Sequence, residues 1–281
     1  PTVLMGATLP AAVAAIASDG DGARRGVAWL YGINTLGAVA GSVVSTFVTL
    51  ERLGTSGTLF AAVALNVTVA AVGVWVSRRL PPRLPMAADG SDGAATANAS
   101  PASRPFVLSA AFVTGFTFFV LELVWYRMLS PILGGTVFTF GLILAVVLFG
   151  IGLGGALYAV AARRDDPEWT LRAFAWTCAL EAAGILVPYA AGDGLAILAG
   201  TLRPLSIFGF GGAVAGWGIV TAMTVLPAAV VAGFQFPLLI SLLGRGGRDA
   251  GRDTAHAYVA NMAGGIAGSL GGGFGLLPWL S

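Results

Sequence analysis

Long, uninterrupted runs of apolar residues constrain the fold of this chain more than any other feature of its sequence. A helix that crosses the hydrocarbon core of a bilayer needs roughly 20 apolar residues, and about eight such runs follow one another here. Only 10% of the 281 residues are charged, and the mean hydropathy is +0.86. Soluble domains carry about 25% charged residues, so this chain is too apolar to present a polar surface to water. We therefore predict an all-α, polytopic transmembrane helix bundle whose main partner is the lipid bilayer.

The apolar runs predict about eight helices, separated by short polar or glycine-rich stretches. They lie near residues 1–17, 27–50, 57–77, 106–128, 132–162, 172–192, 207–243 and 254–280. The fifth and seventh runs are longer than one span, so we expect turns in them at Gly134-Gly135 and at Pro227 and Pro237. Residues 81–105 are rich in Pro, Ala, Ser and Gly without apolar periodicity, which predicts a flexible linker outside the membrane.

An internal repeat is the strongest evidence of domain organisation. A shift of 227 residues aligns 1–54 with 228–281 without a gap and with 16 identities, among them Pro, Arg, Tyr and Asn in one register. This register makes residues 1–80 the last three helices of a first repeat, and 106–281 the first five of a second. A six-helix repeat used twice in parallel accounts for the arrangement. Because both copies are incomplete, we expect the chain to be a fragment of a longer protein.

The distribution of arginine predicts the orientation. All fifteen basic residues are arginines; twelve fall in or beside the linker and the loops near 18–26, 163–171 and 244–253, and three on the other side. Cytoplasmic loops carry an excess of basic residues. We therefore expect the linker to be cytoplasmic and the protein to lie in the bacterial plasma membrane.

Both repeats contain the pattern Y-x-x-N-x-x-G-x-x-x-G-S, from Tyr31 to Ser42 and from Tyr258 to Ser269. Its small-xxx-small spacing lets two helices approach closely in lipid. The glycines concerned are Gly37, Gly41, Gly264 and Gly268. The asparagine of each copy, Asn34 or Asn261, lies about one turn earlier. Two alternatives stay open for the asparagines: hydrogen bonds across a helix interface, or the wall of a pseudo-symmetric central cavity.

Two acidic residues stand inside apolar runs. Glu122 precedes Trp125 and Tyr126, whose rings suit the outer membrane interface, and Glu181 lies within the run at 172–192. An ionisable group at membrane depth is costly and usually faces a partner or a wet cavity. Glu122 is therefore a candidate site for a cation or a proton, with Trp125 and Tyr126 available to stack on an amine. Glu181 is a similar candidate.

Several other kinds of chemistry are disfavoured. The single cysteine, Cys178, excludes a disulfide framework, and the single histidine, His256, disfavours a histidine-rich metal site. The G-x-G-x-x-G pattern at 150–155 lies inside an apolar run, so it predicts a helix-packing stripe and not a dinucleotide loop. No catalytic set of residues can be assembled. We expect no catalytic residue, no metal site, no cofactor in this chain, and no nucleic-acid binding.

Three segments resemble the membrane region of fused major-facilitator/spermidine-synthase proteins. They are PTVLMGATLPAA (1–12), LYGINTLGAVAGS (30–42) and VLELVWYRMLSPILGGTVFTFGLILAVVLFGIGLGGAL (120–157). The resemblance covers nearly the whole chain except the linker and is weakest at 190–230. It implies two major-facilitator-like repeats that precede a cytoplasmic domain similar to spermidine synthase, an aminopropyltransferase. Such a domain would use decarboxylated S-adenosylmethionine and an amine acceptor.

No segment of such a soluble domain is visible in this chain, and the second repeat departs from the motifs. GATLP becomes Gly233-Phe-Gln-Phe-Pro237, and NTLGA becomes Asn261-Met-Ala-Gly-Gly265. The resemblance implies a transporter-like membrane module that handles a polyamine or a related small cation. The alternative is a membrane anchor or scaffold for a downstream spermidine-synthase-like domain that this chain lacks. A wet cavity that reaches mid-membrane with Glu122 or Glu181 on its wall would favour transport. A core filled by glycine, alanine and leucine, with both acids facing the headgroups, would favour the anchor.

Overall fold

The computed structural model describes residues 21–79, 102–161, 167–243 and 250–280. Every regular element within these ranges is a helix and none is a strand, which confirms the all-helical prediction. The helix expected at 1–17 and most of the linker expected at 81–105 lie outside the described residues. The chain divides into two compact units: Pro1–Val43 with Ser100–Ser281, and Val44–Ala99.

Five helical segments of the described chain are long and apolar enough to cross a membrane. They are Ile33–Arg79, Arg104–Leu133, Val137–Ala161, Glu168–Ala190 and Phe210–Leu243. A helix suits lipid because it satisfies its backbone N–H and C=O groups within the segment, where no water can do so. These segments identify the chain as an integral membrane protein.

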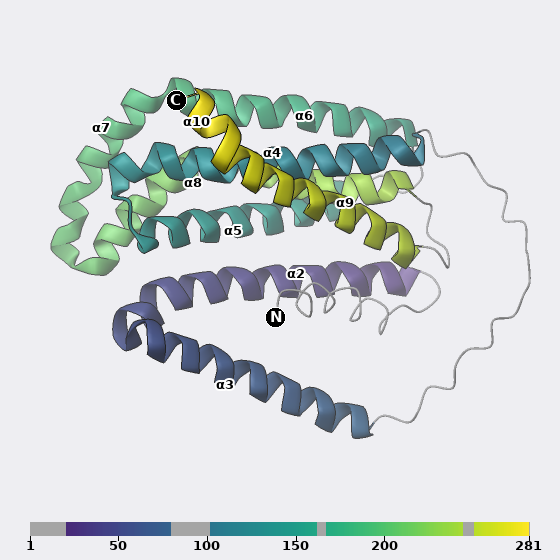
Figure 1. Ribbon diagram of the computed structural model, residues 1–281, viewed down its shortest axis with the longest axis horizontal. Helices are drawn as coiled ribbons and strands as arrows, with labels where there is room; N and C mark the ends of the chain where they lie inside the picture. The colour runs from purple at the N-terminus through teal and green to yellow at the C-terminus, as the bar shows by residue number, and fades with distance from the viewer. Residues whose placement is uncertain (1–20, 80–101, 162–166, 244–249, 281) are drawn as a thin grey trace, which may run out of the picture. The chain divides into compact units, whose positions relative to one another are not determined.

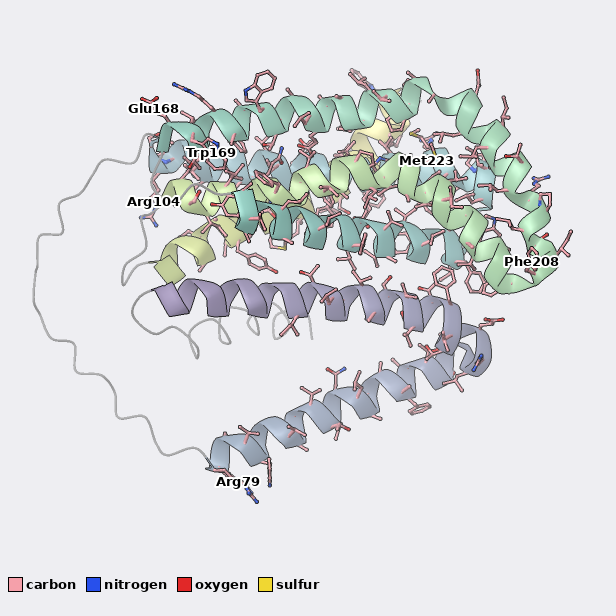
Figure 2. All side chains as sticks on the ribbon, turned by 180° about the vertical axis from the view of Figure 1, so that it is seen from behind. Arg79, Arg104, Glu168, Trp169, Phe208 and Met223 are labelled. Atoms are coloured by element: carbon pink, nitrogen blue, oxygen red, sulfur yellow. The ribbon has the colours of Figure 1, made fainter. Side chains whose placement is uncertain are left out.

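The larger unit is a bundle of apolar helices (Figure 1). It contains α2 (Asp21–Val44), α4 (Arg104–Leu133), α5 (Val137–Ala161), α6 (Pro167–Ala190), α7 (Gly192–Leu202), the 3₁₀ helix η2 (Arg203–Phe208), α8 (Phe210–Leu243), α9 (Ala250–Gly271), the π-helix η3 (Gly272–Leu276) and α10 (Leu277–Leu280). Helix α8 packs extensively against both α5 and α6, and α4 packs against α9. Charged and aromatic residues mark the ends of the bundle: Figure 2 shows Arg104, Glu168 and Trp169 at one end and Phe208 at the other.

The core of this unit consists of two clusters of buried apolar side chains. The first joins α4, α5 and α8 and contains Leu121, Trp125, Leu129, Leu133, Ile143, Val147, Val220, Val225, Ala228 and Ala229. The second lies around the beginning of α4 and the end of α8 and contains Ala102, Val107, Ala111, Phe174, Leu238, Leu239 and Leu242. Because α8 contributes to both clusters, it is the central element of the unit.

The turn predicted at Gly134-Gly135 is present, whereas the turns predicted at Pro227 and Pro237 are not. Gly134 has a φ of 93°, a conformation that glycine adopts without steric cost, and it ends α4 as expected. Helix α8 runs without a break through Pro227 and Pro237, so the interruption expected there does not occur. Neighbouring groups in a membrane bundle can satisfy the backbone carbonyls that a proline leaves free. The short elements α7 and η2 were not predicted.

The described part of the smaller unit contains the π-helix η1 (Ser45–Thr49) and α3 (Leu50–Arg79). Gly54 interrupts the helical geometry with a φ of 65°. No residue of α3 is buried, and large apolar side chains such as Phe60 and Leu65 are 72% and 66% exposed. A helix that is apolar on all sides is typical of a segment surrounded by lipid or by other membrane helices.

Two π-helical segments occupy corresponding places in the predicted repeat. The segment η1 covers Ser45–Thr49 and η3 covers Gly272–Leu276, so each residue of one lies 227 positions from its counterpart. This is the shift that aligns the two copies in the sequence. Their sequences, STFVT and GGFGL, share only the central phenylalanine. The same local deviation from α-helical geometry therefore recurs at equivalent positions despite different side chains.

Candidate functional site

Glu181 of α6 and Gln235 of α8 form a buried polar pair in the larger unit. The Nε2 atom of Gln235 donates a hydrogen bond to Oε2 of Glu181 over 2.9 Å. Gln235 is only 2% exposed and Glu181 only 8%. Burying a carboxylate is costly unless a donor or a cation compensates for its lost hydration. The amide of Gln235 supplies one donor, and the described residues provide no cation that pairs with Glu181.

Small residues bring α6 close enough to α8 for this hydrogen bond. A Cβ atom added to Gly184 would lie 3.2 Å from the backbone nitrogen of Ala228, so the two helices are in backbone contact there. Gly184 lies one turn after Glu181 on α6, and Ala228 lies two turns before Gln235 on α8. The antiparallel helices therefore bring the carboxylate and the amide to neighbouring positions on one interface.

The glycine stripe of α5 fixes the opposite side of α8. A Cβ atom on Gly154 would collide with the carbonyl oxygen of Val230, and one on Gly233 would collide with the backbone of Ile151. Gly150 similarly lies against Ala229. This contact is the packing role predicted for the G-x-G-x-x-G pattern, and it holds α8 between α5 and α6.

Glu122 lies apart from the Glu181–Gln235 pair. It is partly buried on α4, and its carboxylate forms no hydrogen bond or ion pair with another described residue. Helices α4 and α6 meet only through side chains near Phe174, since no Cα atom of α4 lies within 8 Å of one of α6 in the described ranges, and no hydrogen bond or ion pair there joins Glu122 to Glu181. The structure therefore does not bring the two predicted acidic residues into one site.

The two aromatic residues after Glu122 are packed. Trp125 is 2% exposed and belongs to the first core cluster, where its ring meets Phe118 edge-on at 6.0 Å between centroids. Tyr126 is partly buried and makes a similar contact with Phe140 at 6.0 Å. The indole of Trp125 is thus occupied by core packing and does not line an open cavity.

The two asparagines of the repeated motif have different environments. Nδ2 of Asn261 on α9 donates to the carbonyl oxygen of Ala111 at 3.1 Å and lies 3.4 Å from Oγ1 of Thr114, both on α4. This is the contact that the helix-packing alternative describes. Asn34 on α2 is exposed and makes no such contact with the described residues.

The repeated glycines differ in the same way. Added Cβ atoms on Gly264 and Gly268 would collide with the carbonyl oxygens of Phe112 and Phe116, so α9 and α4 touch backbone to backbone. Around Gly37 and Gly41 an added Cβ would have nothing within 4 Å. Within the described residues, backbone contact at the glycines of this motif therefore occurs in the second copy, whereas the first copy meets α5 through Ser42, whose Oγ donates a hydrogen bond to the carbonyl oxygen of Gly141 at 3.2 Å.

Sequence reasoning missed Gln235 as a site residue. The sequence does contain a feature that could have indicated Gln235: it is a polar residue within a long apolar run, at the position where the first repeat has Thr8. Its partner could not be identified from the sequence, since 54 residues separate it from Glu181. The described residues contain no group of three or more His, Cys, Asp or Glu side chains that could hold a metal ion.

Comparison of the chain with protein-family models, with curated proteins and with solved structures finds no match.

Proposed function

We propose that this chain is a transporter-like membrane module that handles a polyamine or a related small cation, as part of a fused spermidine-synthase-like protein. The observation that carries the proposal is the burial of Glu181, whose described hydrogen-bond partner is the neutral amide of Gln235. An acidic residue inside a membrane bundle is by default a functional candidate. A transported cation or a proton would supply the missing positive charge. Glu122, which forms no hydrogen bond or ion pair with another described residue, is a second candidate on α4.

The proposal includes the repeat organisation predicted from the sequence. Two parallel, major-facilitator-like repeats would place equivalent helices on the two sides of a central pathway. The π-helical segments η1 and η3, which recur after 227 residues, support equivalence of the copies. In this proposal the linker is cytoplasmic, as the arginine distribution indicates, and the membrane is taken to be a bacterial plasma membrane.

A second candidate function, a membrane anchor for an enzyme domain, is favoured by the tight packing of the larger unit. Glycines bring α8 against α5 and α9 against α4 at backbone distance. One cavity of the described part of this unit, which is described below, has no acidic residue in its wall. An anchor needs only such packing and no pathway for a substrate.

Removal of each acidic charge in the full-length protein separates the two functions. The variants are Glu181→Gln and Glu122→Gln, with Glu168→Gln as the matched control, because Glu168 is an exposed residue of α6 that pairs with Arg172 at 2.9 Å. Binding of radiolabelled spermidine by purified protein and its uptake into proteoliposomes are measured. We expect Glu181→Gln to reduce both about tenfold or more, since it removes the charge that attracts the cation, while Glu168→Gln changes neither. Absence of saturable spermidine binding by the wild-type protein would favour the anchor.

A further inference from the structure

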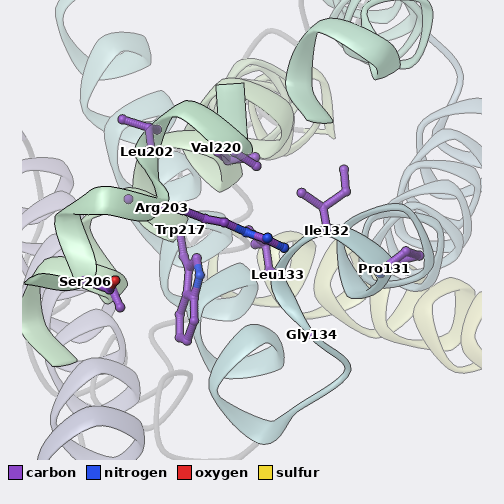
Figure 3. A pocket seen from close by; sticks show the side chains of 12 residues that line it. Pro131, Ile132, Leu133, Gly134, Leu202, Arg203, Ser206, Trp217 and Val220 are labelled. Carbon is purple, nitrogen blue, oxygen red and sulfur yellow. The ribbon is translucent and has the colours of Figure 1, made fainter. Parts of the chain in front are cut away.

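A cavity of about 480 Å³ lies at the end of the larger unit where η2 leads into α8. Its wall consists of the end of α4, residues 131–134, together with residues of α7, η2 and α8 (Figure 3). This volume lies within the range of pockets that hold small molecules, about 300–1,000 Å³. None of the site residues predicted from the sequence, Glu122 and Glu181 included, lines it.

The cavity has an apolar base and a polar rim. Leu133 and Val220, at the base, are 7% and 0% exposed. At the rim, Arg203 and Ser206 are exposed and Trp217 is partly exposed. Figure 3 shows the Arg203 side chain directed across the cavity toward Ile132 and Leu133 of α4. The cavity is thus suited to a molecule with a polar head and an apolar body.

The polar side chains of the rim are hydrogen-bond donors. The guanidinium of Arg203 and the indole N–H of Trp217 can only donate, and the hydroxyl of Ser206 can donate as well as accept. None of these three groups forms a side-chain hydrogen bond or ion pair with another described residue. Arg203 is the one charged residue in the wall, and no carboxylate faces it across the cavity. A cluster of free donors around one positive charge complements an anionic group, above all the oxygens of a phosphate.

Glycines allow close packing between the helices that form the cavity wall. A Cβ atom added to Gly212 would collide with the carbonyl oxygen of Leu205, and one added to Gly216 would lie 3.3 Å from that of Leu202. Gly209, between η2 and α8, has a φ of 80° and closes the turn. The close approach of η2 to α8 places Arg203 and Ser206 beside Trp217 without a ligand, so little ordering is needed when one binds.

We propose that this cavity binds a phosphate-bearing amphiphile, with its phosphate at Arg203, Ser206 and Trp217 and its apolar part against Leu133 and Val220. The cavity adjoins the end of the candidate span Arg104–Leu133 and the first part of Phe210–Leu243, and the ends of a helix that crosses the hydrocarbon core reach the lipid headgroups. A phospholipid and a free organic phosphate share the chemistry that Arg203 recognises. The proposal stands independently of cation handling, because its site and the sign of its ligand's charge are both different.

Binding to the purified full chain in an uncharged detergent tests the proposal. Three probes are compared by thermal shift and by native mass spectrometry: dioctanoyl-phosphatidylglycerol, glycerol 3-phosphate and uncharged dioctanoylglycerol. We expect the phosphatidylglycerol to bind, the uncharged diacylglycerol to bind at least about tenfold more weakly, and Arg203→Gln to remove that difference. Arg127→Gln is the matched control, because Arg127 is an exposed arginine of α4 outside the cavity wall.

The source of the phosphate is decided by the second probe. If glycerol 3-phosphate binds in the same Arg203-dependent way but more weakly than the phosphatidylglycerol, the site also accepts a free organic phosphate; if only the lipid binds, the ligand is a headgroup. If glycerol 3-phosphate binds as tightly as the lipid, the proposed contact of an apolar part with Leu133 and Val220 is wrong. Equal binding of charged and uncharged amphiphiles, equal losses in Arg203→Gln and Arg127→Gln, or no binding of any probe would overturn the proposal. Should Arg203→Gln not fold, Ala213→Phe, which fills the cavity from α8, takes its place and must abolish binding.

Discussion

Gln235 donates a hydrogen bond to Glu181 across the α6–α8 interface, from a position 54 residues further along the chain. Both side chains are buried within segments that are long and apolar enough to cross a membrane. In hydrocarbon no water is present to hydrogen-bond an unpaired carboxylate or amide. Each of the two residues therefore lowers the free-energy cost of burying the other. The pair therefore couples the rotational setting of α6 to that of α8.

This coupling predicts a non-additive pair of substitutions. Gln235→Leu leaves the carboxylate of Glu181 buried without its donor, and we expect a loss of about 1–3 kcal/mol in stability. Replacing both residues by leucine removes both polar groups, so the double variant should be more stable than Gln235→Leu alone. Thermal unfolding of the four proteins in detergent forms a double-mutant cycle. Strictly additive losses would show that the hydrogen bond does not couple the two helices.

The repeated glycines give a second prediction with an internal control. Gly264→Leu and Gly268→Leu place a side chain against the carbonyls of Phe112 and Phe116, which must force α9 away from α4. Overpacking of this kind costs about 1–3 kcal/mol or more. Gly37→Leu and Gly41→Leu have open space and should leave the thermal stability unchanged. Equal destabilisation by all four variants would show that the first copy of the motif also packs against a helix.

The asparagines allow the same comparison for hydrogen bonding. Asn261→Leu removes the donor to Ala111 and Thr114, and we expect a loss of about 0.6–1.7 kcal/mol, the range of interhelical hydrogen bonds in membrane bundles. Asn34→Leu changes an exposed residue and should have no measurable effect on stability. The measurement is thermal unfolding of the purified chain in detergent. A larger loss from Asn34→Leu than from Asn261→Leu would contradict the assignment.

The orientation can be tested with single cysteines in a Cys178→Ala background. Ser91→Cys lies in the linker, and Ile207→Cys lies in η2, where Ile207 is 83% exposed. A membrane-impermeant thiol reagent added outside intact cells should label the cysteine at 207 and leave the one at 91 unlabelled until the cells are opened. The reverse pattern would invert the topology that the arginines predict.

The sequence by itself determined the class of the protein and the approximate extent of its helices. Apolar runs of about 20 residues form helices in lipid, because the backbone N–H and C=O groups must then form their hydrogen bonds within the same segment. The predicted runs near 106–128 and 172–192 correspond to α4 and α6, which extend a few residues further at most of their ends. Glycine at 134 marked a real turn, because glycine has no Cβ atom and adopts the positive φ of this turn without steric cost.

Only the tertiary structure decided which polar and small residues meet. Asn34 and Asn261 stand in the same motif, yet one is exposed and the other reaches across to α4. Neither Gln235 nor Arg203 was predicted as a site residue from the sequence. Gln235 meets Glu181 from 54 residues away along the chain, and the cavity wall at Arg203 includes residues 131–134 of a distant segment. A helix carries its hydrogen bonds within itself, so its sequence determines that it forms. The face it turns to a neighbour depends on how whole helices rotate and cross, and no local pattern contains that information.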